Sequence, residues 1–217
     1  MGKIDELIIK LCPNGVPYIK LQEIAEIGTG SSDRKDAVEN GEYPFYVRSK
    51  DVLRINKYEY DETAIVIPGE GGIGEIFHCV EGKYALHQRA YRIHIISNNL
   101  NTKYLYYYMS AMFKKFIMKK AVSATVTSIR KPMIEQFPVA VPPIEVQEEI
   151  VRILDNFTEL TAELTAELTA ELTARQKQYE YYRNKLLSFD ESAETLDTLH
   201  THTRILLRTR NKMANII

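Results

Sequence analysis

The sequence FTELTAELTAELTAELTARQKQYEYYRNKLLSF, at residues 157–189, decides the fold. Within it, Thr-Ala-Glu-Leu occurs three times in tandem, from Thr161 to Leu172. The chain contains no Gly or Pro from Ile144 onward, and Ala, Leu, Glu, Gln, Lys and Arg all favour helix. We therefore predict one helix from about Ile144 to about Leu187, roughly 65 Å long at about 1.5 Å per residue.

The apolar residues of this predicted helix are spaced as in a coiled coil. From Val146 to Leu164 they follow one another at steps of 4, 3, 4, 3 and 4 residues. The repeat then turns the apolar stripe by about 40° per four residues. A solvated helix or linker is the alternative, but it would not need a leucine in every repeat. The predicted seam, which requires a second helix, consists of Ile150, Ile153, Phe157, Leu160, Leu164, Leu168, Leu172, Tyr179 and Leu186.

Length and composition allow one domain of moderate size before the helix, because the chain has 217 residues. It has no run of about 18 apolar residues, so no membrane span is expected. The first residues carry acids and no small-residue cleavage site, which argues against a signal peptide. Two cysteines give no disulfide framework and suit a reducing compartment. A cytoplasmic location follows.

Charge is unevenly distributed along the chain. The formal net charge of −1, taken alone, argues against a nucleic-acid partner. From Gly82 to Ile134, however, there are ten Lys or Arg and no Asp or Glu. Acids gather instead at Asp33–Asp61 and along the predicted helix. An acid-free, basic segment of this kind is typical of a phosphate-binding face.

Shorter patterns before the long helix predict a small mixed α/β domain, so the fold class is α+β. A helix is expected at Asp5–Leu11, ended by a Pro-Asn-Gly turn. Tyr18–Ile27 carries alternating and helical signals together, so its type stays open. Strands are expected at Tyr43–Val47, Ala64–Ile67, Ala90–Ile96 and Phe137–Val141.

A second helix is expected from Lys103 to about Ala121, capped by Thr102. Its predicted apolar face consists of Leu105, Met109, Met112 and Phe116. The four residues Gly71–Gly74 read as a tight turn that leads into a β-rich segment at Glu75–Val80. Pro142 and Pro143 form the hinge into the long helix, since proline suits a first helical turn.

No catalytic or metal-binding motif can be recognised in the sequence. Gly69–Gly74 lacks the Lys-Ser/Thr pair of a phosphate loop and fits a hairpin turn better. His78-Cys79 and His200-x-His202 do not assemble a plausible zinc site. There is no methyl-donor fingerprint, nuclease-type acidic cluster or triad. The chain is therefore expected to recognise a partner, to be no enzyme and to bind no cofactor itself.

Polar residues on the predicted loops are candidates for DNA contacts. His87-Gln88-Arg89 stands at the entry to a strand in the acid-free segment, and Gln and Arg can make bidentate contacts to adenine and guanine edges. Hydroxyls and cations elsewhere could bind phosphates. The full predicted set is Ser31, Ser32, Arg34, Lys35, Arg48, Ser49, Lys50, His87, Gln88, Arg89, Lys119, Lys120, Thr125, Thr127, Ser128, Arg130 and Lys131.

Four stretches together resemble the specificity subunit of Type I restriction–modification systems. LCPNGVPYIKLQEI, from Leu11 to Ile24, resembles the opening of a target recognition domain. ATVTSIRK, from Ala124 to Lys131, and VAVPPIEVQEEIVRI, from Val139 to Ile153, resemble its exit into the family's conserved helix. The tandem Thr-Ala-Glu-Leu repeat is the most specific of the four.

This resemblance implies a domain that reads double-stranded DNA and a spacer helix that also docks DNA methyltransferase subunits. Restriction subunits are further expected partners. S-adenosylmethionine and ATP are then expected on those partner subunits. The implied division is a target recognition domain at residues 1–141, a spacer helix at 142–189 and a poorly ordered tail at 190–217.

Such subunits usually carry two recognition domains and two spacer helices, whereas only one of each can be recognised here. The tail from Ser192 does not begin a second domain that can be recognised and looks shifted or truncated. The resemblance therefore implies a half-length form that pairs, helix antiparallel to helix, with a second copy of itself. The alternative is a coiled-coil structural adaptor with a protein-binding head, which would have no need of the acid-free segment.

Overall fold

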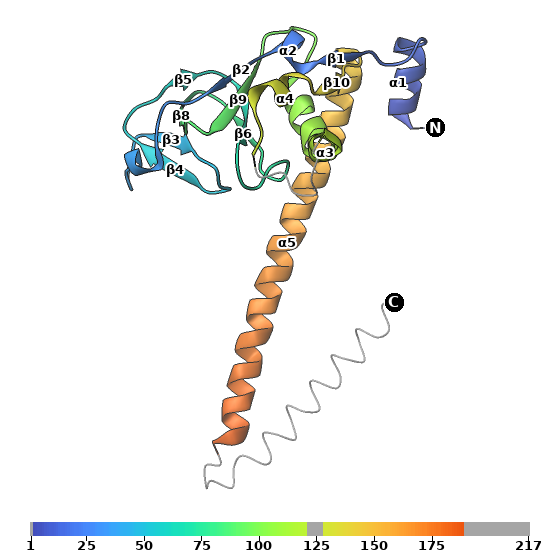
Figure 1. The fold of residues 1–217 in the computed structure, drawn as a ribbon. Helices are drawn as coiled ribbons and strands as arrows, with labels where there is room; N and C mark the ends of the chain where they lie inside the picture. Colours follow the sequence, from blue (N-terminus) through green and yellow to red (C-terminus); the bar gives the residue numbers. More distant parts are fainter. Residues whose placement is uncertain (1, 121–127, 189–217) are drawn as a thin grey trace. The chain divides into compact units, whose positions relative to one another are not determined.

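The computed structural model describes residues 2–120 and 128–188, without the side chain of Lys120. The chain divides into two compact units, residues 1–158 and residues 159–217. The first unit is a mixed α/β domain that ends with the first turns of the long helix α5 (Ile144–Leu187), and the rest of α5 belongs to the second unit (Figure 1). The predicted α+β fold class is confirmed, and the predicted tail at 190–217 lies outside the described residues.

A four-stranded antiparallel sheet forms the centre of the first unit. Its order is β2 (Ala25–Thr29), β9 (Ala90–Ile95), β6 (Ala64–Pro68) and β7 (His78–Val80). All five residues of β6 are buried, because this strand lies inside the sheet with covered faces. Ile65 and Ile67 pack in one core with the helix α3 (Thr102–Lys120), whereas Ala64 and Val66 belong to a second core. The strands predicted around Ala64 and Ala90 are confirmed.

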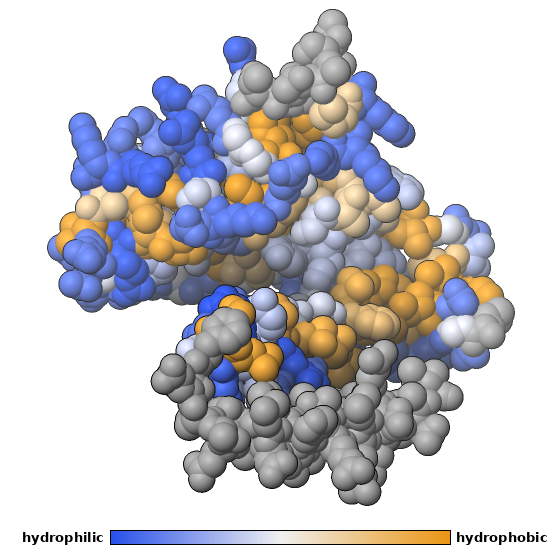
Figure 2. Space-filling model, turned by 90° about the horizontal axis from the view of Figure 1, so that it is seen from below, coloured by the Kyte–Doolittle hydropathy of each residue, from blue (hydrophilic) through white to orange (hydrophobic). Residues whose placement is uncertain are grey.

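A second four-stranded sheet has the order β4 (Val52–Ile55), β3 (Tyr43–Tyr46), β8 (Lys83–Leu86) and β5 (Tyr60–Asp61). β3 and β8 pair in parallel, and two small cores around Phe45 and Tyr84 hold this sheet together. Only β3 was predicted, and the sequence analysis missed β4, β8 and the two-residue strand β5. In the view of Figure 2, the lobe at the left, which carries this sheet, shows mostly hydrophilic residues with smaller apolar patches.

The ambiguous stretch from Tyr18 to Ile27 contains both kinds of structure. It forms β1 (Tyr18–Lys20), the one-turn helix α2 (Leu21–Ile24) and then most of β2. β1 pairs antiparallel with β10 (Pro138–Ala140), the last strand before α5. Two further helices are α1 (Lys3–Leu11), which was predicted, and α4 (Lys131–Glu135), which was not.

Two details predicted for α3 are wrong. The side chain that caps its first turn is that of Asn101, whose Oδ1 accepts hydrogen bonds from the backbone N–H of Lys103 and of Tyr104. The buried face contains Phe113 and Ile117, whereas Met112 is 45% exposed. Phe113 and Ile117 lie at four-residue steps from Leu105 and Met109, which fits an α-helical face.

The segment predicted as β-rich from Glu75 is a strand only at His78–Val80. Gly72 and Gly74 both have positive φ, and the amides of Glu75 and Ile76 bond back to the carbonyl of Gly72. These turn bonds hold the residues before His78 out of the sheet.

The helix α5 has the predicted bounds. Its first turns pack on the first unit: Val146, expected to begin the coiled-coil seam, is buried there, and Ile150 packs partly against the same core. The buried amide of Gln147 donates to the carbonyls of Asn99 and Pro142 and accepts from the backbone N–H of Asn101. No helix within residues 2–120 and 128–188 combines the length and apolar character that a membrane crossing requires.

In the second unit the Thr-Ala-Glu-Leu repeats leave their leucines in solvent. Leu160, Leu164, Leu168 and Leu172 are 56–68% exposed. The threonines, in contrast, are satisfied within the helix: the hydroxyls of Thr165, Thr169 and Thr173 each donate to the carbonyl four residues earlier. The threonine hydroxyls are therefore hydrogen-bonded within the helix, and the leucines form an exposed apolar stripe.

Candidate nucleic-acid interface

Four loops of the first unit meet at one edge of the two sheets. They are the loop after β2, which contains the 3-10 turn η1 (Arg34–Asp36), and the loops β3–β4, β6–β7 and β8–β9. Ser32 forms a parallel bridge with His87, and the amide of Gln88 donates to the carbonyl of Ser32 at 2.9 Å. The amide of Gly69 donates to the carbonyl of Arg89 at 2.8 Å. Backbone bonds therefore fix the loop after β2 and the loops β6–β7 and β8–β9 relative to one another.

Gly30 allows one of these close approaches. A Cβ atom at this position would lie 1.7 Å from the carbonyl oxygen of Leu86. No side chain can be accommodated at that distance, so the loop that carries Ser31 and Ser32 can run against β8 only with glycine here.

An open pocket of about 290 Å³ lies between these loops. It brings together four predicted residues from three loops and adds three that were not predicted. Its lining residues are Arg34, Val47, Arg48, Ser49, Glu70, Gly71 and His87. Arg89 is joined to the same site through Glu70. The pocket therefore brings guanidinium groups from separate loops to one concavity.

Glu70 is the acid of this pocket, and it pairs with two arginines from different loops. The Nη1 atom of Arg48 lies 2.8 Å from its Oε2, and the Nη1 atom of Arg89 lies 3.1 Å from the same oxygen. The hydrogen bond from Arg89 is the main cause of a pKa below the ordinary range for the Glu70 carboxyl, and Arg48 adds to it. Glu70 is therefore ionised at neutral pH. Sequence reasoning missed it because it was taken as part of a glycine-rich turn.

His87 is 4% exposed and forms the inner wall of the pocket. Its Nδ1 accepts the backbone N–H of Arg89 at 3.0 Å. Burial lowers the pKa of His87, and the nearby Arg48 lowers it further. The ring is therefore neutral at pH 7, with its proton on Nε2, and can act as a hydrogen-bond donor.

Acids also hold the predicted serines and glutamine. The hydroxyls of Ser31 and Ser32 both donate to Oε1 of Glu59, and the Gln88 amide donates to Oδ2 of Asp33 at 3.0 Å. Ser32 is completely buried, so in this conformation it supports the loop from inside. Gln88 and Ser31 remain exposed at the edge.

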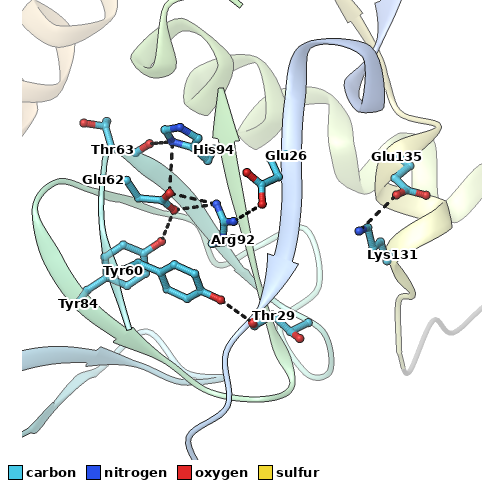
Figure 3. Close-up of polar contacts among 10 residues, drawn as sticks. All are labelled: Glu26, Thr29, Tyr60, Glu62, Thr63, Tyr84, Arg92, His94, Lys131 and Glu135. Carbon is cyan, nitrogen blue, oxygen red and sulfur yellow. Dashed lines mark hydrogen bonds and ion pairs between the residues drawn. The ribbon is translucent and has the colours of Figure 1, made fainter. Parts of the chain in front are cut away.

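The other predicted contact residues are less concentrated. Lys35, Lys50, Ser128 and Arg130 are exposed, and Ser128 is bridged to Glu70. Lys131 faces Glu135 at 3.8 Å on α4 (Figure 3). Lys119 is exposed on α3, away from the residues that line the pocket. Thr125, Thr127 and the side chain of Lys120 lie outside the described residues.

Arg92 shows that the acid-free segment is not one solvent face. This residue of β9 is 7% exposed and binds Glu62 at 3.0 Å and Glu26 at 2.5 Å (Figure 3). Its guanidinium also stacks on the Tyr60 ring, whose hydroxyl donates to the carbonyl of Thr29. At least one of the ten basic residues of this segment is therefore buried inside the domain, where Arg92 connects β2 of the first sheet with β5 of the second.

No group of three His, Cys, Asp or Glu side chains within residues 2–120 and 128–188 is arranged to hold a metal ion. His78, considered in the sequence, stacks against Tyr46, and its Nε2 lies 3.2 Å from the carbonyl oxygen of Ser49. Its position supports the β3–β4 loop.

Fold and site together define a binding domain with a polar, arginine-lined edge, followed by a long repeat-bearing helix. The model of the Type I restriction modification DNA specificity domain matches residues 13–174. The chain belongs to this family.

Individual relatives agree with this assignment. The chain is 34% identical over 165 residues to a Haemophilus influenzae protein assigned as a type I restriction enzyme specificity subunit, covering 73% of this chain and 42% of that protein. It is 31% identical over 137 residues to the EcoDI specificity subunit of Escherichia coli, covering 63% and 30%. The chain thus spans less than half the length of these two relatives.

The crystal structure of the type I restriction–modification S subunit from M. genitalium has a similar fold. The TM-score is 0.56 at 18% identity, covering 82% of this chain and 48% of that one. At this identity the likeness concerns the fold alone.

Proposed function

We propose that this chain is the sequence-specific DNA-recognition subunit of a Type I restriction–modification complex. The observation that carries the proposal is the family match over residues 13–174, which runs from near the start of the first unit through the Thr-Ala-Glu-Leu repeats of α5. The loop edge with Arg34, Arg48, Gln88 and Arg89 supports it, because guanidinium and amide groups suit phosphates and base edges. The family match also favours this function over a structural adaptor.

We further propose that two copies pair through α5. Four leucines of the repeat are more than half exposed, and fully burying a leucine stabilises by about 1.5–3 kcal/mol. A tandem repeat of identical units can match itself in antiparallel orientation, so a second copy is a fitting partner. A two-fold dimer presents the same surface twice. Its DNA site would therefore be an interrupted palindrome.

In this proposal the chain directs chemistry that it does not perform. DNA methyltransferase subunits dock on it, and restriction subunits join where the system has them. S-adenosylmethionine and ATP bind to those partners, and the complex works on DNA in the cytoplasm.

Methylome sequencing tests both levels of the proposal. Cells that carry this chain with its methyltransferase should methylate one interrupted motif, and cells without the chain should not. Two identical, inverted half-sites support the homodimer. Two unrelated half-sites contradict the homodimer but keep the recognition function, whereas no chain-dependent motif contradicts both.

A further inference from the structure

The starting point is that Glu70 contributes little to the fold. Arg48, Arg89 and Glu70 are 42%, 58% and 36% exposed. Exposed ion pairs contribute about 0–1 kcal/mol to stability, because water screens them and long side chains lose freedom. An acid is nevertheless held between two arginines at the centre of the candidate interface. Stability alone does not explain this placement.

The pocket around Glu70 is suited to an anion. Arg34, Arg48 and Arg89 bring three positive charges, and Glu70 neutralises one of them. The neutral ring of His87 adds a donor at the wall. A carboxylate and a phosphodiester have the same charge and both offer oxygens that guanidinium groups bind strongly. The Glu70 carboxylate therefore stands where a DNA phosphate would bind.

Glu70 can leave this place without rearranging the sheets. Its carboxylate is partly exposed, so rotation of the side chain is enough to release the arginines. The following residue, Gly71, has φ of +64° and no atom within 4 Å of where a Cβ would be, so space is open beside it. The backbone of Glu70 can stay paired with Ser128.

We propose that Glu70 is an internal substitute for a DNA phosphate that keeps Arg48 and Arg89 occupied until the domain docks on its own site. This inference rests on the proposed DNA-recognition function. On random DNA the carboxylate competes with phosphates for the two arginines, so non-specific affinity is reduced. On the cognate site, contacts to base edges hold a phosphate in the pocket and displace Glu70. Glu70 then determines specificity, and Arg89 contacts the backbone of DNA rather than a base.

The test compares Glu70→Gln with Glu75→Gln in the full chain, bound to a random-sequence duplex. Glu75 is a matched control, because it is an exposed acid of the same loop, paired with Lys114. Glu70→Gln should bind about 3–10-fold tighter and steepen the slope of log K against log salt by about one to two, since each freed phosphate contact adds about 0.9. Glu75→Gln should show less than half of this effect.

A variant without the two arginines shows whether they cause the expected gain in non-specific DNA affinity. In the Arg48→Gln/Arg89→Gln variant, the further change Glu70→Gln should leave non-specific affinity and salt slope unchanged. Circular dichroism and the melting temperature of each variant confirm that it is folded.

Three results would overturn the inference. Glu70→Gln could bind random DNA no more tightly than wild type, Glu75→Gln could match it, or the gain could persist without the two arginines. A wild-type chain that binds no duplex, alone or with its methyltransferase, overturns the proposed function itself and the inference with it.

Discussion

At the scale of single residues, Arg92 is the clearest case of a charge that serves the fold. Its guanidinium is buried, bonded to two carboxylates and stacked on Tyr60, while its Nε has no hydrogen-bond partner among the described residues. Removing one partner of a buried pair leaves the other charge without compensation. Arg92 therefore stabilises the fold, although it lies in the acid-free segment from Gly82 to Ile134 that was expected to face DNA.

We expect Arg92→Met to lower the free energy of unfolding by about 2–4 kcal/mol, because Glu62 is left partly buried without its partner. Urea denaturation measures the loss. The control is Arg175→Gln, which removes an exposed helical pair with Glu171 and should cost about 0.5 kcal/mol or less. Equal losses in the two variants would show that the network does not support the domain.

Gln88 is the exposed residue best suited to read a base. Gln88→Ala should cost about 1–3 kcal/mol on the cognate site and relax one base position. Lys119→Ala should instead weaken binding to all sequences alike and flatten the salt slope. A binding-site selection followed by salt titration separates the two effects. Full sequence preference in Gln88→Ala would rule this residue out as a base reader.

At the scale of secondary-structure elements, α5 has two different surroundings. Its first turns are part of a packed domain, and Glu149 there binds Arg152 at 2.7 Å and Lys3 of α1 at 2.9 Å. Its later turns expose the repeat leucines. One helix therefore packs on the first unit at its start and exposes apolar side chains further along.

The Glu149 pair should make stability depend on pH. The hydrogen bond from Arg152, followed by that from Lys3, lowers the pKa of the Glu149 carboxyl from 4.5 to about 2. Because the folded pKa is depressed, the stabilisation is complete above pH 4.5 and is lost as pH falls towards 2. Thermal melts of the wild type should therefore decline more steeply across this range than those of Glu149→Gln. Parallel curves would contradict the role given to Glu149.

The repeat should set the distance between the half-sites. One Thr-Ala-Glu-Leu unit adds about 6 Å of helix, and a base pair about 3.4 Å of duplex. Deleting Thr165–Leu168 should shorten the unread spacer by one or two base pairs, and duplicating it should lengthen the spacer, with the half-sites unchanged. Methylation of a library containing every spacing measures this. If the native, shortened and lengthened forms, all folded and dimeric, preferred the same spacing, the repeat would not set the distance between the half-sites.

At the scale of the whole molecule, the proposed dimer depends on the stripe of exposed leucines. We expect Leu164→Asn with Leu168→Asn to convert a dimer into a monomer, because buried seam positions tolerate leucine far better than an unpaired amide. Analytical ultracentrifugation measures the mass. Glu163→Gln with Glu167→Gln is the control on the same repeats and should stay dimeric. A wild-type chain that is monomeric at high concentration would contradict self-association.

The sequence by itself determined the elements that depend on local periodicity. The bounds of α5, the strands at Ala64 and Ala90, and the family followed from spacing and motifs. Helix propensity and apolar repetition act between neighbours in the chain, so they can be read without a structure.

Only the tertiary structure decided which polar residues meet. The pairing of Glu70 with Arg48 and Arg89, the burial of Ser32 and Arg92, and the short strands of the second sheet depend on contacts between distant segments. Met112 was misplaced for the same reason, since the face of a helix that is buried depends on what packs against it. A count of charges along the chain does not say which side chains face solvent and which face one another. That is decided only when the sheets bring separate loops to one edge.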